Sequence, residues 1–293
     1  MKLKNTCLLV LLLMLTFLSC TSKTEQEQIN ADLLPIHSYH FVLTSLDISD
    51  VSDNSRATFW KPDGSLMFVT GRFTENVAVY SISVPWDLST AAFHSEFNLP
   101  EYFSENTGLS VAHGLYLKDT GRKMYVFNRT EIWAFELIEP WDITTAQTLY
   151  TQDLSDFVQR GHDIDFHPSG EILYIDDRNA RAVHQVNLST PWNIRTMTWD
   201  YTLDIRDMEK EVRGIEFVKD GSIMLLLDTV RKELMQYHLE EPWNIRTARY
   251  VNSLDLSSIS NDPRGLSISS DLSKIYITAR EQKIIYQLEL ENQ

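Results

Sequence analysis

Five basic side chains recur in this sequence at a spacing that could bring them to one point. Each lies eight residues before an equivalent turn position, and together they are Arg56, His113, His162, Arg213 and Arg264. Guanidinium and imidazole groups that converge attract an anion and donate charge-assisted hydrogen bonds to it. These five residues are therefore candidate ligand-binding residues. The competing interpretation is structural, because a residue type that recurs in every repeat often holds the scaffold, here by pairing with an Asp or Asn of a neighbouring repeat.

A second group consists of carboxylates at positions where the other repeats carry different residues. Its members are Asp163, Asp165, Asp176, Asp177 and Glu216. Such a cluster can bind Ca²⁺ through oxygen ligands, and the candidate metal ligands are Asp163, Asp165, Asp176 and Asp177. It can also supply an acid–base pair for hydrolysis, because neighbouring carboxylates raise one another's pKa. The candidate catalytic residues are Asp163, Asp165, Asp176 and Glu216.

The same carboxylates also have a structural interpretation. Three nearby arginines, Arg178, Arg181 and Arg213, could neutralise the acids and close a central channel with ion pairs. No Gly-x-Ser-x-Gly, P-loop, Gly-x-Gly-x-x-Gly or His-Glu-x-x-His motif accompanies the acids. Without such a motif, a non-catalytic binding protein is the favoured hypothesis.

An internal repeat supplies the elements that position both groups. The motif Pro-Trp-Asp/Asn-Ile/Leu-x-Thr occurs at residues 85–90, 140–145, 191–196 and 242–247, with spacings of 55, 51 and 51 residues. Short apolar runs precede each copy, separated by Asp-Gly or Ser-Gly turns, and another run follows it. Short strands joined by such turns are typical of antiparallel hairpins. Four strands in a repeat of this length predict one blade of a β-propeller, with the Trp of each Pro-Trp turn wedged between blades on the rim opposite the basic residues.

The sequence also predicts how the ring closes. A fifth repeat begins near Arg264 and ends at Gln293 without its fourth strand. The missing strand matches residues 44–49, which resemble residues 252–257 at the offset of 208 that also relates Arg56 to Arg264. We therefore expect an all-β fold, a five-bladed β-propeller over residues 37–293, whose last blade is closed by an N-terminal strand at about 37–49.

This architecture resembles bacterial propellers of the NHL and lactonase-like type, which work in the periplasm or on the cell surface. Its Pro-Trp repeat is similar to one found in poorly characterised propeller proteins. The pattern departs from WD40 arrays, because each Trp follows Pro and two copies carry Asn193 and Asn244 in place of Asp. The resemblance implies an architecture and no particular activity.

The N-terminal segment is typical of an export signal. Lys2 and Lys4 precede an apolar run over residues 7–18, which is too short for a hydrocarbon core that needs about 20 helical residues. The run ends in Ser19-Cys20, which resembles the lipobox of bacterial lipoproteins, although Phe17 stands where that pattern usually has Leu. The resemblance implies a signal peptide over 1–19, lipidation of Cys20 and a flexible tether over 20–36. Cleavage without lipidation is the alternative.

Charge and cysteine content exclude several classes of partner. The net charge is −15, and removal of Lys2 and Lys4 with the signal makes it −17. A surface this acidic repels nucleic acid and anionic lipid. We therefore expect no nucleic-acid partner, and we expect contact with the membrane only through the lipid anchor. Both cysteines, Cys7 and Cys20, lie in the N-terminal segment, so no disulfide braces the domain. A monomer is expected.

These features predict a lipoprotein of the bacterial cell envelope, exported and anchored in a periplasmic or cell-surface leaflet. It would act as a binding or interaction propeller for a small anionic ligand, a glycan or an envelope protein. No cofactor is certain from the sequence, and Ca²⁺ is the one it allows. The alternative function is a metal-dependent hydrolase, lactonase- or glycosidase-like, that uses the carboxylates of the central channel.

Overall fold

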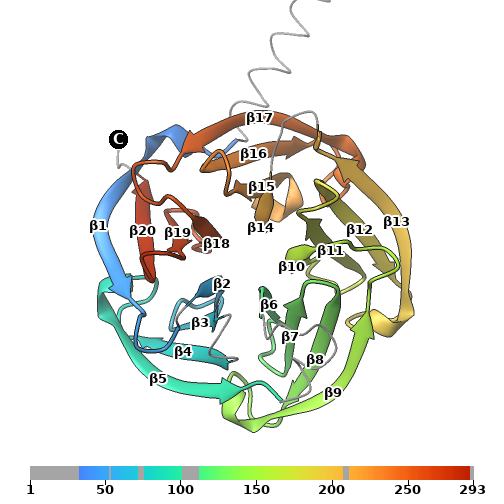
Figure 1. Ribbon diagram of the computed structural model, residues 1–293, viewed down its shortest axis with the longest axis horizontal. Coiled ribbons are helices and arrows are strands. Elements are labelled where there is room, and N and C mark those ends of the chain that lie inside the picture. The colour runs from blue at the N-terminus through green and yellow to red at the C-terminus, as the bar shows by residue number, and fades with distance from the viewer. Residues whose placement is uncertain (1–32, 53, 72–75, 101–111, 207–210, 291–293) are drawn as a thin grey trace, which may run out of the picture. The chain divides into compact units, whose positions relative to one another are not determined.

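The computed structural model describes residues 33–52, 54–71, 76–100, 112–206 and 211–290. Residues from Ile36 onward form one compact unit. Within it, five antiparallel four-stranded sheets stand side by side in a closed ring (Figure 1). The predicted five-bladed β-propeller is therefore confirmed.

Each blade runs from an innermost strand at the axis to an outermost strand at the rim. Blade 1 contains β2 (Ser55–Trp60), β3 (Leu66–Gly71), β4 (Asn76–Ile82) and β5 (Ala91–Asn98). Blade 2 contains β6 (Gly114–Leu117), β7 (Lys123–Asn128), β8 (Glu131–Leu137) and β9 (Ala146–Asp153). Blade 3 contains β10 (Gly161–Phe166), β11 (Ile172–Asp177), β12 (Ala182–Leu188) and β13 (Met197–Asp204). Blade 4 contains β14 (Val212–Val218), β15 (Ile223–Asp228), β16 (Glu233–Leu239) and β17 (Ala248–Asp255).

Blade 5 is made from both ends of the described chain. It contains β18 (Pro263–Ile268), β19 (Lys274–Ala279) and β20 (Ile284–Leu290), and its outer strand is β1 (Tyr39–Asp47). β1 pairs antiparallel with β20, with Asp47 opposite Ile284. The predicted closure by the N-terminal strand is confirmed, and it removes the free sheet edge that β20 would otherwise expose.

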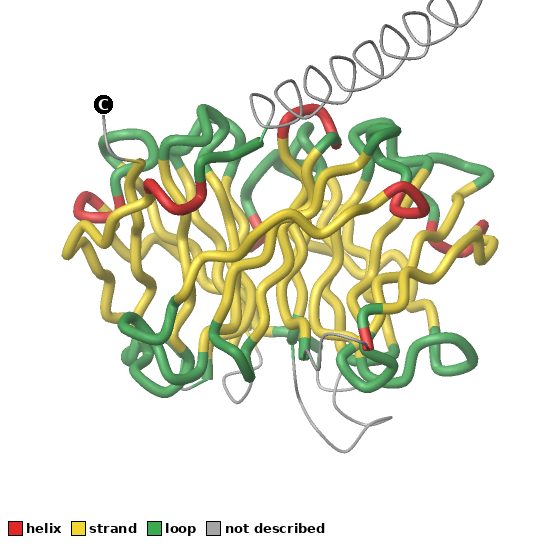
Figure 2. The backbone as a smooth tube through the Cα atoms, turned by 90° about the horizontal axis from the view of Figure 1, so that it is seen from above, coloured by secondary structure: helices red, strands yellow, loops and turns green. Residues whose placement is uncertain are grey.

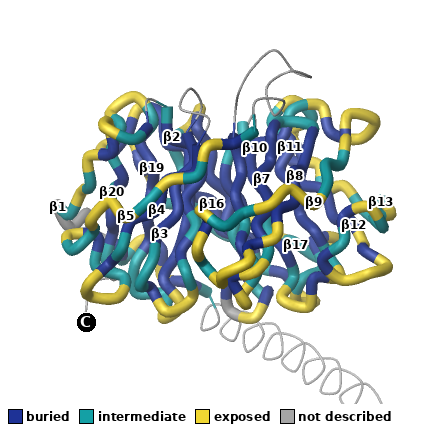
Figure 3. The backbone as a smooth tube through the Cα atoms, turned by 90° about the horizontal axis from the view of Figure 1, so that it is seen from below, coloured by how far each residue is buried: buried dark blue, intermediate teal, exposed yellow. Residues whose placement is uncertain are grey.

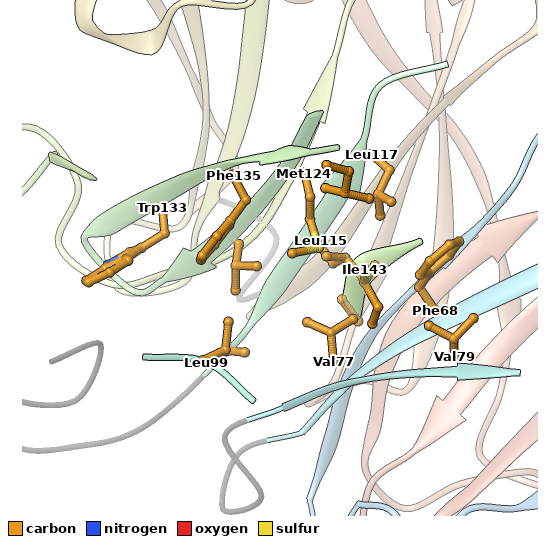
Figure 4. Packing of buried hydrophobic residues seen from close by; sticks show 14 residues of the cluster. Phe68, Val77, Val79, Leu99, Leu115, Leu117, Met124, Trp133, Phe135 and Ile143 are labelled. Atoms are coloured by element: carbon orange, nitrogen blue, oxygen red, sulfur yellow. The ribbon is translucent and has the colours of Figure 1, made fainter. Parts of the chain in front are cut away.

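Apolar side chains on both faces of the inner strands hold the blades together. Phe68, Val77 and Val79 of blade 1 share one cluster with Leu115 and Met124 of blade 2 (Figure 4). The inner and middle strands are buried, whereas the outermost strands and the loops carry most of the exposed positions (Figure 3). Burying a side chain of this size contributes about 1.5–3 kcal/mol, so the packing between blades is the main source of stability.

The repeated Pro-Trp motif forms a turn that locks each outer strand to its neighbours. Trp86 adopts a left-handed backbone with φ of 64°. Its ring covers Gly64, where an added Cβ would lie 2.5 Å from the indole. Asp87 then caps the short helix η2 (Leu88–Thr90) by accepting a hydrogen bond from the amide of Ser89. The motif is thus a structural wedge, as the sequence predicts, and its Trp rings also pack against the adjoining blade.

The connecting loops gather at the two ends of the ring (Figure 2). The Pro-Trp turns lie at the end where each innermost strand finishes, as Trp60 of β2 stacks on Trp86. The opposite end is where each innermost strand begins. No helix among the described residues has the length and apolar character needed to cross a membrane.

Candidate functional site

The five predicted basic residues converge at the beginning of the innermost strands. Together they line one narrow pocket, whose empty space of about 160 Å³ includes the open solvent at its mouth and leaves no room for a water-sized sphere. We call the set Arg56, His113, His162, Arg213 and Arg264 the basic ring. A β-bulge interrupts the pairing of the first two strands at this position in blades 1, 3, 4 and 5. Because a bulge re-aims the side chain at its position, it explains how an edge strand turns these groups toward the axis. The five side chains therefore converge as the spacing of the repeats predicts.

The two histidines of the ring lie face to face and are neutral. Both are 3% exposed, and their ring centroids are 4.3 Å apart with an interplanar angle of 31°. Burial lowers the pKa of His113 well below its usual value, and the charge of Arg56 lowers it further. Burial also lowers the pKa of His162, with His113 and Arg213 adding to the shift. Near pH 7 the imidazoles therefore add no charge to the ring.

Two carboxylates supply counter-charge to the arginines of the ring. Glu211 pairs with Arg213 at 3.0 Å and with Arg178 at 2.6 Å, and the hydrogen bond from Arg178 keeps the pKa of Glu211 low. Asp262 pairs in the same way with Arg264 and with Arg280. Each carboxylate is thus shared by two arginines, so the ring end of the channel keeps an excess of positive charge.

The structural alternative predicted that each basic residue pairs with an Asp or Asn of a neighbouring repeat. Arg213 and Arg264 do pair with acids, but their partners Glu211 and Asp262 belong to the same repeat as the arginine. The actual partners, Glu211 and Asp262, were missed. Each stands two residues before its arginine, which is the signal that could have identified them.

Along the same inner strands, the candidate acids of blade 3 bridge to blade 4. Asp163 accepts hydrogen bonds from the amides of Ile164 and Ile215, at 3.0 and 3.3 Å. Asp165 repeats this arrangement one step further along the strand, with Phe166 and Phe217 at 2.7 and 2.9 Å. Since β10 and β14 meet edge to edge, these carboxyls satisfy backbone donors that no neighbouring strand can reach.

Asp163 and Asp176 are buried, and Asp165 and Glu216 are partly buried. Burial raises the pKa of Asp165 to about 7, raises that of Asp176 to about 8, and raises those of Asp163 and Glu216 well above their usual values. Among the described residues, none of these four carboxyls forms an ion pair. The expectation that Arg178 and Arg213 neutralise them is therefore wrong, because both arginines are held by Glu211. Burial thus shifts the pKa of all four acids upward, and those of Asp165 and Asp176 lie near neutral pH.

Asp176 and Asp177 are neighbours with different surroundings. The Oδ1 atom of Asp176 accepts hydrogen bonds from the amides of His162 and Asp163, and its Oδ2 atom is buried without a partner in the described structure. Asp177 accepts four backbone amides, including those of Gln159 and Ala180. Burial raises its pKa, but the hydrogen bonds from His184 and from those amides outweigh burial and lower it. Asp177 is therefore ionised and braces a loop.

A second cavity of about 70 Å³ lies further along the channel, toward the Pro-Trp turns. We call it the acidic cavity, since Asp163, Asp165 and Glu216 contribute to its wall, together with aromatic residues such as Phe59 and Tyr116. Asp176 and Asp177 do not line it. In the described part of the chain, no three His, Cys, Asp or Glu side chains are grouped so as to hold a metal ion, so the Ca²⁺ prediction gains no support there.

The predictions for the N-terminal segment fall on residues outside the described ranges. They are the signal peptide over 1–19 and the lipidation of Cys20.

The fold and the channel define the class of this protein as a five-bladed β-propeller. No family model matches the chain, and no curated protein does. Among solved structures, a functionally unknown protein from Desulfotomaculum acetoxidans aligns with a TM-score of 0.46 at 12% identity, over 77% of this chain and 62% of its own.

Two further solved structures align to a similar degree. A protein described as a putative 6-phosphogluconolactonase from Bacteroides uniformis aligns with a TM-score of 0.47 at 12% identity, over 79% of this chain and 65% of its own. The Cps50 (Swd1) β-propeller domain of Myceliophteria thermophila gives 0.45 at 12% identity, over 80% and 65%. The chain thus spans less than two thirds of each neighbour, and likeness at this level concerns the fold alone.

Proposed function

We propose that this chain is a binding propeller that holds a small anionic ligand at the basic ring, whose side chains move apart to admit it. The observation that carries the proposal is a set of buried polar atoms that lack partners in the described structure. They include both ring nitrogens of His162, the Nε of Arg213, and the Nε and Nη1 of Arg264. Buried polar atoms in native proteins are nearly always hydrogen-bonded, so a cluster around one cavity indicates oxygen atoms supplied from outside the chain.

The charge of the ring favours an anion over a neutral glycan. Glu211 and Asp262 are each divided between two arginines, so neither neutralises the ring. Hydrogen bonds from guanidinium groups to carboxylate or phosphate are among the strongest in proteins. In a chain with a net charge of −15, this mouth also differs in sign from the rest of the molecule, which steers an anion toward it.

Titration of the chain from Thr21 onward with acetate, glycolate, phosphate and sulfate tests the proposal. At least one anion should raise the melting temperature, because a ligand that binds only the folded state adds about 2.7 kcal/mol at a hundred times its Kd. Reversing Arg213 and Arg264 to Glu should abolish the effect. Reversing Arg206 and Arg249 is the matched control, since these exposed arginines pair with Asp204 and Glu240.

The outcomes of this titration separate the candidate partners. Loss of binding in the ring variant alone supports the proposal. Equal loss in both variants would mean that binding follows overall charge, which contradicts it. No response to any anion would leave an envelope protein or a neutral glycan as the partner and overturn the proposal.

The proposed location rests on the N-terminal sequence. The chain is exported, lipidated at Cys20 and tethered to the bacterial cell envelope, with the propeller as its soluble part. Feeding cells a labelled fatty acid should label the wild type and leave Cys20→Ser unlabelled. Labelling of both variants, or of neither, contradicts lipidation at this residue.

A hydrolase is the second candidate function, and the acidic cavity favours it. Asp165 and Glu216 line that cavity, and burial raises the pKa of both, so each can hold a proton that a general acid would donate. Assays with lactone and aryl glycoside substrates should show turnover that Glu216→Gln lowers more than a hundredfold. Turnover that survives this change would remove Glu216 from the chemistry.

A further inference from the structure

The basic ring is divided into two halves with different hydrogen-bonding character. The arginines Arg213, Arg264 and Arg56 come from blades 4, 5 and 1, whose innermost strands are successive neighbours. The histidines come from blades 2 and 3. Guanidinium groups only donate hydrogen bonds, so the arginine half requires acceptor oxygens.

The histidine half also presents a hydrogen-bond acceptor, because of the tautomer of His113. Its Nδ1 atom lies 3.3 Å from the carbonyl oxygen of Gly161. A carbonyl oxygen can only accept, so Nδ1 carries the proton. The neighbouring arginines and burial lower the pKa of His113 and keep the ring neutral, which leaves a lone pair on Nε2.

That lone pair lacks a donor within the described structure. The Nε2 atom of His113 is buried without a hydrogen-bond partner, and His113 is one of the five residues that line the ring cavity. His162 lies face to face with it and so does not donate to it. An ionised carboxylate has no hydrogen to give, so a simple anion would satisfy the arginines and leave this nitrogen unpaired.

We infer that the ligand of the basic ring carries a hydrogen-bond donor beside its acid group, as a hydroxy acid does. Its carboxylate binds the arginine half, and its hydroxyl donates to Nε2 of His113. The inference rests on the proposed anion-binding function and adds the class of ligand. Hydrogen phosphate, which keeps one hydroxyl near neutral pH, meets the same two requirements, whereas sulfate does not.

Two matched pairs of ligands test the inference. Glycolate differs from acetate by one hydroxyl. At pH 8 phosphate is mainly HPO₄²⁻, which has the same charge as sulfate and one hydroxyl more. Leaving a buried acceptor unpaired costs enough to weaken binding by about ten- to hundredfold, so glycolate should bind that much more tightly than acetate. Phosphate should exceed sulfate in the same way.

The variant His113→Phe keeps an aromatic ring packed against His162 and removes the lone pair of Nε2. In this variant the ratio of glycolate to acetate affinity should fall to about one. The variant is compared with wild type by melting temperature first, and His113→Leu, which also lacks an acceptor, serves if Phe does not fold. A preference that persists in the variant contradicts the role of His113.

A measurement without ligand checks the tautomer itself. In the ¹⁵N spectrum of histidine-labelled protein, Nδ1 of His113 should show the shift of a protonated nitrogen and Nε2 that of an unprotonated one. A proton on Nε2 overturns the inference even if anions bind. Equal affinity for glycolate and acetate also overturns the inference about the hydroxyl, but leaves the proposed anion-binding function intact. If no anion binds at all, both the inference and the proposed function are wrong.

Discussion

Replacing Asp176 with Asn should stabilise the protein more at pH 8 than at pH 5. Burial raises the pKa of the native carboxyl from its usual value of 3.8 to about 8. Between these values the folded state holds a proton that the unfolded state has released, so wild-type stability falls as pH rises. Asn does not titrate, and its carbonyl oxygen can still accept the amide hydrogens of His162 and Asp163.

The magnitude follows from the width of that window. One pH unit corresponds to about 1.4 kcal/mol, so the three units from pH 5 to pH 8 give an upper bound of roughly 4 kcal/mol. Relaxation of the protein and water entry reduce the cost of burying a charge, so the change in the Asn–Asp difference should lie between about 1 and 4 kcal/mol. The histidines of the ring, whose lowered pKa values cost stability only below about pH 6.5, affect wild type and variant alike.

Urea denaturation followed by tryptophan fluorescence, at equal ionic strength and at both pH values, measures this difference. The adjacent Asp177→Asn is the matched control. Asp177 is ionised in both states at pH 5 and at pH 8, because its folded pKa is lowered. Its contribution is present above the unfolded pKa and is lost only as pH falls through the folded one, so Asp177→Asn should destabilise about equally at both pH values.

One outcome of the denaturation experiment would contradict the raised pKa of Asp176. If Asp176→Asn changes stability by the same amount at pH 5 and pH 8, the native carboxyl does not bind an extra proton. The buried Oδ2 atom of Asp176 would then have a partner that stabilises its charge, and the acids of the channel would be ordinary structural groups.

Three further predictions concern the scaffold. Gly64→Ala should lower the free energy of unfolding by about 2–4 kcal/mol in chemical denaturation. The reason is that the residue has φ of 73° and its new Cβ would lie 2.5 Å from the Trp86 ring. A loss below about 1 kcal/mol would mean that the turn relaxes. Tyr276→Phe removes the hydrogen bond from the Tyr276 hydroxyl to the Trp86 carbonyl between blades 5 and 1, and its thermal unfolding should show a loss of about 1 kcal/mol. Deleting β1 should leave the β20 edge open and produce oligomers in size-exclusion chromatography, and a well-folded monomer would contradict the closure.

The fold could be predicted from the sequence because the repeat carries its own register. Four Pro-Trp motifs fix the blade length, and the offset of 208 residues that relates Arg56 to Arg264 also assigns the N-terminal strand to the last blade. A hydrogen-bonded blade is a local unit, so spacing along the chain translates directly into position around the axis. The convergence of the basic ring followed from the same alignment.

The electrostatic state of the channel could not be predicted in this way. Repeat alignment identifies which residues face the axis, but the partners Glu211 and Asp262 lie before the innermost strands, where the repeats share little sequence. The protonation of the acids depends on burial and on which backbone amides they reach. Both are properties of the assembled ring and of neighbouring blades, which no single repeat contains.

The scaffold itself does not require charge at the position of Asp165. The equivalent residues of the five blades are Phe59, Tyr116, Asp165, Glu216 and Ser267. Ser267 bridges to the next blade with a neutral hydroxyl that donates to the carbonyl oxygen of Thr58, and Phe59 packs against Tyr116.

Asp165 and Glu216 break this neutral pattern at a cost. Their raised pKa values mean that the folded state must retain protons at neutral pH, which lowers stability compared with neutral side chains. A costly departure from a repeat that tolerates neutral groups is more readily explained by a function of the cavity than by a need of the fold. The same reasoning applies to the histidines of the ring, which replace arginine in two adjacent blades and give one side of the channel an acceptor that arginine cannot supply.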